Sequence, residues 1–316
     1  MVKNEIIKVD SGEIRLSKII LGSSDYLKLN NMSKVHAMFG AYVNAGGLAI
    51  DTARHYRESE SVIGEWLNGK PRSAYTIITK CCHPVREAPH APRVTPEDII
   101  QDLTTSLEML GTDYVDILLL HRDDINYPVG PLMETLSQLV DEQKIRAFGV
   151  SNWTLGRIKE ALAYCQEHQL HPLSFNSPNL SLAAVNCQRW DNTVTANQEM
   201  LDWHEANQFP LIAWSAQAEG FFGHRFKKED KDNPELKEFV DVYFNELNWK
   251  RLDICDRLAR EKGVKPIQVS LAYVLNQPFP VFATIGPEEE WHLQDSLDAL
   301  DIRLSDEEME SLRKGE

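Results

Sequence analysis

Short apolar runs alternate with longer amphipathic segments along most of the chain. The clearest amphipathic segment spans Thr95 to Leu110, where apolar residues recur every three or four positions. Thr95 is a typical helix-capping residue, Pro96 suits the first helical position, and Gly111 favours termination. The spacing therefore predicts a helix here, and similar patterns predict helices over Ser33 to Ala45 and Leu132 to Gln143.

The apolar runs between the helical segments have the length and composition of buried β-strands. A continuous apolar run of four to eight residues is typical of a strand that is covered on both faces. Eight such runs are predicted, at Ile19 to Leu21, Ala49 to Asp51, Thr76 to Lys80, Ile117 to Leu120, Ala147 to Ser151, Ser174 to Asn176, Leu211 to Ser215 and Val281 to Thr284.

Regular alternation of strands and helices restricts the fold. Each strand–helix–strand unit pairs its strands in parallel through a right-handed crossover, and eight units most simply close into a barrel. Before the first unit, Ile6 to Ser17 carries Asp10-Ser11-Gly12 between two alternating runs, which is a hairpin pattern. We therefore expect an α/β fold, a (β/α)8 TIM barrel formed by residues 1–316 as one domain, with the N-terminal hairpin closing the barrel floor.

Composition narrows the classes of partner. The 316 residues include 33 Lys and Arg against 48 Asp and Glu, a net charge of −15, which disfavours nucleic acid and anionic membrane surfaces. The sequence has no apolar stretch near the roughly 20 residues of a membrane span and no signal-peptide pattern. The five scattered cysteines indicate free thiols, and the Cys81-Cys82-His83 group with His90 lacks zinc-site spacing. We expect a cytoplasmic protein without a metal.

Four polar residues stand where predicted strands end. Asp51 closes the second strand with Tyr56 shortly after it, Lys80 closes the third, and His121 follows the fourth. Taken singly, each has a structural explanation, such as helix capping by Asp51 or a solvated strand end at Lys80. In a parallel barrel, however, the C-terminal ends of the strands surround the active site. We therefore expect these four side chains to meet at one mouth.

Together the four residues form a chemically coherent catalytic group. A tyrosine can donate a proton near neutral pH only when its phenolate is stabilised, and Lys80 could provide that stabilisation. Asp51 would keep Lys80 charged and oriented, and His121 could hold a carbonyl oxygen by a hydrogen bond. Side chains cannot supply a hydride, so a reduced cofactor is required. The residues predict interconversion of a carbonyl and an alcohol, with Tyr56 as general acid or base.

The same residues lie in motifs that resemble those of the aldo-keto reductase family. Asp51-Thr52-Ala53-Arg54-His55-Tyr56 is similar to its D-T-A-x-x-Y signature, and Thr79-Lys80 is similar to its strand-three lysine motif. The segment from Tyr114 to His121 resembles the strand-four motif, and Gly149 to Trp153 resembles G-x-S-N-F/W. The resemblance covers about residues 10 to 310. It implies a nicotinamide cofactor extended across the barrel mouth.

The resemblance also assigns cofactor-binding residues. Ser151 and Asn152 should bind the nicotinamide carboxamide together with Asn176, which stands where the family has Gln, and Trp214 stands where a Tyr stacks on the ring. Backbone and side chains from Ser215 to Phe222 should cover the pyrophosphate. The remaining expected contacts to the cofactor are Ser215, Gln217, Gly220, Phe222, Gly286, Glu288, His292, Asp295 and Ser296.

The residues after the eighth strand bear on the choice of coenzyme. Family members that use NADP commonly carry Lys or Arg near Glu288, whereas this chain has three glutamates from Glu288 to Glu290. Acidic side chains repel a 2′-phosphate but can accept a hydrogen bond from a ribose hydroxyl. The sequence favours NAD(H) over NADP(H). Two alternatives stay open: the glutamates only enrich a first helical turn, or cations at His224, Arg225, Lys227 and Lys228 compensate for them.

The loops predict a polar substrate, and two other classes of function remain open. The expected substrate contacts suit a sugar or polyol better than an apolar aldehyde, and they are Asp25, Tyr26, His83, Trp153, Arg189 and Trp190. One alternative is a nucleotide-sensing regulatory subunit, like the potassium-channel β subunits that share the family's fold. A less favoured alternative is a metal-dependent barrel hydrolase that uses Asp51, His55, His83 and His121, which the neighbouring Lys80 would oppose.

Overall fold

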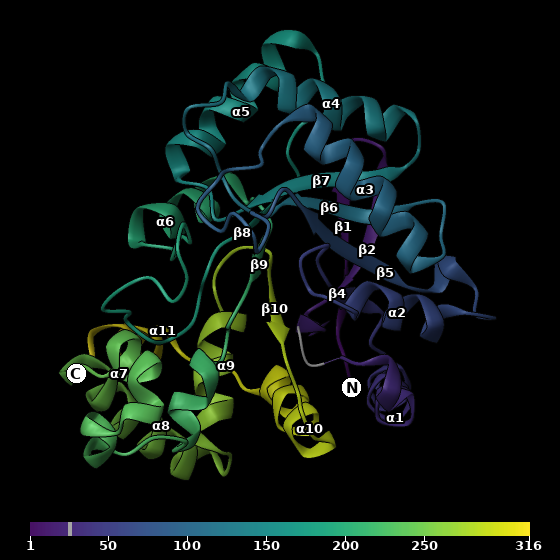
Figure 1. Ribbon diagram of the computed structural model, residues 1–316. Coiled ribbons are helices and arrows are strands. Elements are labelled where there is room, and N and C mark those ends of the chain that lie inside the picture. The colour runs from purple at the N-terminus through teal and green to yellow at the C-terminus, as the bar shows by residue number, and fades with distance from the viewer. Residues whose placement is uncertain (25–26) are drawn as a thin grey trace.

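Eight parallel strands form a closed barrel in the computed structural model, which describes residues 1–24 and 27–316 (Figure 1). The strands follow the chain order around the barrel, and the eighth pairs with the first. All eight predicted strands are confirmed, with ends shifted by a residue or two. Their bounds are β3 Ile19–Gly22, β4 Ala49–Asp51, β5 Thr76–Cys81, β6 Val115–Leu120, β7 Ile145–Ser151, β8 Phe175–Ser177, β9 Leu211–Ala213 and β10 Val281–Ile285.

Helices surround the barrel on its outside (Figure 1). The predicted helix after Thr95 is confirmed: the Thr95 hydroxyl accepts a hydrogen bond from the Asp98 amide at 3.2 Å, and Gly111 ends the helix with a φ of 62°. The helices are α1 Met32–Asn44, α2 Ser59–Leu67, α3 Pro96–Leu110, α4 Val129–Asp141, α5 Leu155–His168, α6 Gln198–Asn207, α7 Lys237–Tyr243, α8 Glu246–Lys262, α9 Pro266–Leu275, α10 Glu290–Asp298 and α11 Asp306–Lys314. In the described part of the chain, no helix has the length and apolarity that crossing a membrane requires.

The N-terminal hairpin closes one end of the barrel, as predicted. Its strands β1 Asn4–Val9 and β2 Gly12–Ser17 pair antiparallel around the expected turn. Ile14 and Leu16 are fully buried and pack with inward-facing barrel residues such as Ile20, Ile78 and Phe175. The hairpin thus supplies apolar side chains to the barrel interior at its N-terminal end. The opposite end, where the strands finish, is left for the polar residues.

The long connection after β9 has local structure of its own. The connection that follows β9 begins with Ser215 at a φ of 49° and continues into a 3-10 helix at Ala218–Gly223. This backbone explains why β9 ends at Ala213, before the predicted end at Ser215. Phe221 and Phe222 are fully buried in an aromatic cluster with Phe244 and Trp249. Aromatic packing, rather than solvent, therefore orders this connection.

Candidate active site

Asp51, Lys80 and Tyr56 lie together at the mouth of the barrel. The Lys80 ammonium donates to both carboxylate oxygens of Asp51 at 2.7 Å and to the Thr52 carbonyl at 2.9 Å. It also lies 5.2 Å from the centre of the Tyr56 ring. Neighbouring strands β4 and β5 supply Asp51 and Lys80, so the sheet register brings them into contact. Three of the four predicted side chains are therefore in direct proximity.

Electrostatics keep Lys80 charged although it is buried. Burial alone would lower the pKa of Lys80, but the Asp51 carboxylate and the Tyr56 hydroxyl outweigh this effect, and the pKa is raised. A buried cation is tolerated only when it is paired and hydrogen-bonded. Lys80 is thus a fixed positive charge beside the Tyr56 hydroxyl.

His121 completes the group from the end of β6. Its ring centre lies 5.7 Å from that of Tyr56 and 4.8 Å from that of His83. Burial, and then the positive charges of Arg122 and Lys80, hold the pKa of His121 well below its usual value. The imidazole is therefore neutral at physiological pH. Its buried Nδ1 has no hydrogen-bond partner among the described residues.

A buried polar network supports the turn that carries Tyr56. The Thr52 hydroxyl donates to the Ser59 hydroxyl at 3.0 Å, and Ser59 donates to Ser23 at 2.5 Å. The Thr79 hydroxyl donates to the Glu60 carboxylate at 2.6 Å. These bonds fix the connection between β4 and α2 on both sides of Tyr56. They were not predicted, because single Ser and Thr residues carry no distinctive sequence signal.

Ser151 and Asn152 lie beside His121 at the end of β7. The Asn152 amide donates to the His121 carbonyl at 3.1 Å and to the Ser151 hydroxyl at 3.0 Å, and Asn152 has a φ of 63°. The Ser151 hydroxyl donates to the Ser177 carbonyl at 2.8 Å. Upstream, a Cβ at Gly149 would collide with the Phe175 carbonyl, so this motif position requires glycine. The motif is therefore placed at the mouth, as its use in cofactor binding requires.

Asn176 lies on the other side of the barrel wall. Its neighbour Phe175 packs in the barrel interior, and side chains alternate along a strand, so Asn176 points outward. Its amide nitrogen lies 2.9 Å from His204 Nε2 and 3.4 Å from the Met200 sulfur, both on α6. This placement differs from the expectation that Asn176 contacts the nicotinamide.

The structure brings several other expected cofactor residues together between β9 and α10. The Ser296 hydroxyl lies 3.5 Å from Gln217 Oε1, although 79 residues separate them. The Trp214 ring centre lies 5.6 Å from that of Trp190, and its buried Nε1 has no partner in the described structure. Phe222 differs, because its side chain is fully buried in the aromatic cluster. Only its backbone could face a ligand.

The acidic segment before α10 is largely exposed. Glu289 stands directly before this helix without a capping hydrogen bond from its side chain, and it pairs with Lys34 at 2.9 Å. The Glu288 amide donates to His292 Nδ1 at 3.3 Å. Asp295 is buried and paired with Lys265 at 2.7 Å. Gly286 leads into this segment directly from β10. The glutamates thus flank the start of the helix, where the residues predicted to bind adenosine also lie.

The expected substrate residues divide into three groups. His83 is at the mouth, stacked on His55 with ring centres 3.6 Å apart, and burial lowers its pKa to about 4. Trp153 is fully buried and donates to the Arg122 carbonyl at 3.1 Å, so it supports the wall rather than lining the mouth. Of the other four, Arg189 is held by Glu219 and Glu238 at 2.9 Å each, and Trp190 is half exposed. Asp25 and Tyr26 lie outside the described residues.

Arg122 is a residue at this site that was not predicted. It follows His121 and donates to the His121 carbonyl at 2.9 Å. Its charge contributes to lowering the pKa of both His121 and His83, which places it among the mouth residues. The only sequence signal was its position directly after the strand-four histidine.

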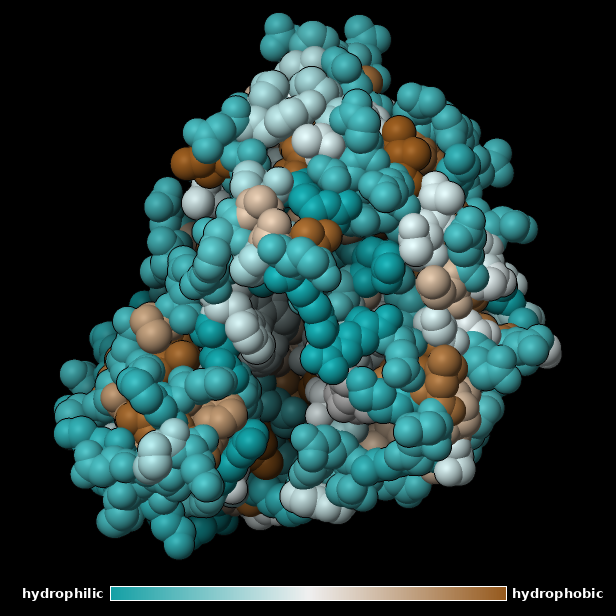
Figure 2. Space-filling view, viewed as in Figure 1, coloured by the Kyte–Doolittle hydropathy of each residue, from teal (hydrophilic) through white to brown (hydrophobic). Residues whose placement is uncertain are grey.

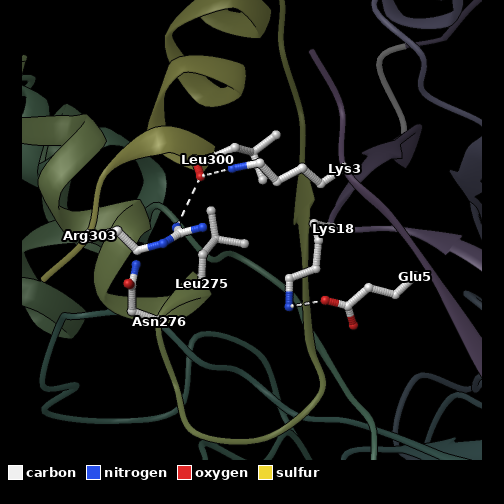
Figure 3. A pocket seen from close by; sticks show the side chains of 7 residues that line it. All are labelled: Lys3, Glu5, Lys18, Leu275, Asn276, Leu300 and Arg303. Atoms are coloured by element: carbon white, nitrogen blue, oxygen red, sulfur yellow. Dashed lines mark hydrogen bonds and ion pairs between the residues drawn. The ribbon is translucent and has the colours of Figure 1, made fainter.

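Cavities and charged clusters elsewhere do not compete with this site. A cavity of about 290 Å³ lies at the opposite, N-terminal end of the barrel, between Lys3, Glu5, Lys18 and Arg303 (Figure 3). Figure 2 shows a mostly hydrophilic face with a hollow between the α7–α8 region and the rest of the barrel. Residues 1–24 and 27–316 contain no group of three or more His, Cys, Asp or Glu arranged to hold a metal ion.

Comparison with known proteins identifies the family. The model of the aldo/keto reductase family matches residues 18–315. The chain belongs to the aldo/keto reductase family. Members are oxidoreductases that act on carbonyls and alcohols with nicotinamide cofactors, so this chain is an enzyme of that class.

Several relatives of this aldo/keto reductase are named after an activity. It is 25% identical to an aryl-alcohol dehydrogenase of Pestalotiopsis microspora, over 88% of this chain and 71% of the relative, and 27% identical to a putative aryl-alcohol dehydrogenase of Saccharomyces cerevisiae, over 95% and 83%. A norsolorinic acid reductase of Aspergillus flavus is 25% identical over 88% and 70%. A solved thermostable aldo-keto reductase, in complex with the inhibitor epalrestat, has a TM-score of 0.74 and 21% identity, covering 99% of this chain and 100% of that one. The last likeness supports the fold.

Proposed function

We propose that this protein transfers a hydride between a nicotinamide cofactor and a carbonyl or alcohol, with Tyr56 as the general acid or base. The observation that carries the proposal is the buried Asp51–Lys80 ion pair against the Tyr56 ring. A charged lysine at this point stabilises a phenolate, which makes Tyr56 a competent proton donor near neutral pH. Asp51 acts through Lys80, as its positioning residue.

In the reductive direction, His121 would hold the carbonyl oxygen and Tyr56 would protonate it. The low pKa of His121 leaves a neutral imidazole, which can donate one directional hydrogen bond without competing for the proton. As the Tyr56 proton leaves, the Lys80 ammonium stabilises the phenolate. The bound nicotinamide supplies or accepts the hydride. In oxidation, the same residues work in reverse, and Tyr56 takes the hydroxyl proton.

The residues at the mouth fit a nicotinamide cofactor. Ser151 and Asn152 offer a hydroxyl and an amide beside His121. Trp214, directly after β9, has a buried Nε1 without a partner among the described residues. Trp214 also offers a ring face for stacking. Gln217 and Ser296 would contact the cofactor farther out, between β9 and α10. These residues would hold the group; Asn176 and the side chain of Phe222 would not.

We further propose that NAD(H) is preferred over NADP(H). Glu288 lies exposed at the start of α10, where it would repel a 2′-phosphate but could accept a ribose hydroxyl hydrogen bond. Two of the four cations considered above as compensation have other contacts: His224 pairs with Asp256 at 2.8 Å, and Arg225 donates to the Glu219 carbonyl at 3.0 Å. Lys34 is near this segment but pairs with Glu289.

The coenzyme preference is tested by replacing Glu288 with Arg. Removing a carboxylate and adding a cation at this position should raise kcat/KM for NADP(H) relative to NAD(H) by about tenfold or more. Steady-state kinetics with both coenzymes measures this ratio. Glu261→Arg, on α8, is the control for the same change of net charge. The proposal is contradicted if the unmodified enzyme already prefers NADP(H), or if both variants shift the ratio equally.

We propose an aromatic carbonyl or alcohol as the substrate. Two of the relatives are named as an aryl-alcohol dehydrogenase and a putative aryl-alcohol dehydrogenase. In this chain, the half-exposed Trp190 lies next to Trp214 and offers an aromatic surface near the mouth. The expectation of a sugar or polyol rested partly on Trp153 and Arg189, which are buried or held in ion pairs. Because polar groups such as His83 also lie at the mouth, sugars and polyols are included in the test.

The experiment is a dehydrogenase screen of aryl alcohols, aldehydes, sugars and polyols with NAD(H) and NADP(H), read at the absorbance of the reduced coenzyme. The proposal expects turnover of aromatic compounds with a higher kcat/KM than sugars. Tight coenzyme binding without turnover of any compound would instead favour the nucleotide-sensing subunit. Activity that requires stoichiometric metal, measured by elemental analysis, would favour the hydrolase.

A further inference from the structure

Arg122 holds an unusual position among the arginines of this protein. It is half buried at the barrel mouth, next to His121, and within the described residues the only hydrogen bond of its side chain goes to the His121 carbonyl. Within the described residues, the Arg122 guanidinium forms no ion pair with a carboxylate. Burial lowers the pKa of Arg122, while Tyr56 and Asp191 act in the opposite direction.

Other buried arginines are held by acidic partners or by hydrogen bonds to distant segments. Arg157 is held by Asp123 at 3.2 Å, and Arg189 by Glu219 and Glu238. Arg251 also has a lowered pKa, caused by burial, and no acidic partner among the described residues. However, Arg251 donates to the carbonyls of Leu182 and Arg313, and these contacts tie α8 to two distant segments. Arg251 thus has a structural role, whereas Arg122 makes no contact of this kind.

Holding a guanidinium half buried without a carboxylate is unfavourable. Partial removal from water costs free energy that an ion pair or several hydrogen bonds normally recover. The described residues supply neither an ion pair nor several hydrogen bonds to Arg122. Its guanidinium has five N–H donors, arranged so that two of them can bind a carboxylate at once. Such residues concentrate at functional sites, where a ligand completes the interaction. The missing partner is therefore expected in the ligand.

The surroundings of Arg122 define where that ligand group would lie. Arg122 adjoins His121, which would hold the reacting oxygen, and it lies close enough to His83 to affect its titration. Asp191, on the long connection after β8, faces the same region and contacts His90 at 3.6 Å. A negatively charged group that binds Arg122 would thus sit within the same mouth as the reacting carbonyl.

We propose that Arg122 binds a carboxylate of the substrate, so that the preferred substrate is an anionic aromatic carbonyl or alcohol. This inference rests on the proposed function, because it assigns a substrate class to the same site. Arg122 is a specificity-determining residue and takes no part in the proton or hydride transfer. Its effect is on binding of carboxylated substrates, and hence on KM rather than kcat.

The test compares benzaldehyde with its 2-, 3- and 4-carboxy derivatives in the unmodified enzyme and in Arg122→Met and Arg122→Lys. The unmodified enzyme should favour one carboxy isomer over benzaldehyde by about tenfold or more in kcat/KM, carried by KM. Arg122→Met should remove this ratio, and Arg122→Lys should restore part of it because the charge returns. Arg303→Met, at the opposite end of the barrel, is the control and should keep the ratio.

Calorimetric titration of the coenzyme-bound protein with benzoate provides a readout that needs no turnover. Benzoate binding should weaken about tenfold in Arg122→Met and stay unchanged in Arg303→Met. The inference is overturned if no carboxy isomer is preferred, or if Arg122→Met keeps both the preference and the benzoate affinity. If benzoate binding depends on Arg122 but no aldehyde is reduced, the proposed reaction fails while carboxylate binding stands.

Discussion

Replacing Tyr56 with Phe should lower kcat by about 100- to 10,000-fold, the usual contribution of a positioned general acid or base. The ring and its contact with Lys80 at 5.2 Å are retained, while the proton that must reach the carbonyl oxygen is lost. Coenzyme affinity should change little, because Tyr56 acts on the substrate. Steady-state kinetics and a fluorescence titration of the coenzyme measure the two quantities on the same preparation.

The matched control is Tyr164→Phe, which removes a hydroxyl that donates to Glu134 at 2.6 Å on the surface. This variant should keep full activity. The role of Tyr56 would be refuted if Tyr56→Phe retained more than about a tenth of the turnover, or if its loss of activity followed an equal loss of coenzyme binding.

Replacing Lys80 with Met should reduce both activity and stability. The change leaves the Asp51 carboxylate buried without its partner, and breaking a buried pair from one side costs about 3–5 kcal/mol. Turnover should fall as well, because nothing then stabilises the Tyr56 phenolate. Denaturant unfolding measures the first effect and kinetics the second. Adding Asp51→Leu to Lys80→Met should recover part of the stability but none of the activity.

Lys237→Met is the control for the stability effect. Lys237 forms an exposed ion pair with Asp241 at 2.7 Å, so its loss should cost no more than about 1 kcal/mol. An equally small loss for Lys80→Met would contradict the buried ion pair.

The raised pKa of Lys80 also gives a direction for pH dependence. Burial opposes the charge, Asp51 favours it, and the net pKa lies above the ordinary lysine value. A raised folded-state pKa stabilises the fold fully below the unfolded-state pKa, and this contribution is lost as pH rises through the folded-state value. The contribution of Lys80 to stability is therefore constant across neutral pH and declines only in strongly alkaline solution, a decline that Lys80→Met should lack.

The barrel and its four polar mouth residues were predictable because short segments of sequence show both the strands and the residues at their ends. The strands β4, β5 and β6 are buried runs with Asp51, Lys80 and His121 at or next to their ends, and parallel topology brings those ends together without detailed knowledge of packing. Asp51 pairs with Ile78 in the register of β4 and β5, and Lys80 lies two residues further on, on the same face of β5. The Thr95 cap and the Gly111 stop of α3 were likewise readable from single residues.

The surroundings of other residues could not be predicted, because they depend on tertiary contacts. Adjacent side chains of a strand point to opposite faces, so a shift of one position in β8 decides whether Asn176 faces the barrel interior or α6. The motif spacing alone could not show that the Asn176 amide contacts His204 on α6. Arg189 lies in the expected loop, but its two acidic partners come from segments 30 or more residues away. Arg122 becomes informative only once its lack of an acidic partner in the described chain is visible.

The most direct test of the central claim is to follow deuterium from coenzyme labelled at the nicotinamide C4 position during reduction of an aromatic aldehyde. Mass spectrometry of the alcohol should find one deuterium on the carbinol carbon, delivered from one of the two C4 positions only. Tyr56→Phe should slow its appearance by the factor given above. Coenzyme binding with no deuterium in any product, or deuterium lost to solvent, would contradict direct hydride transfer at this site.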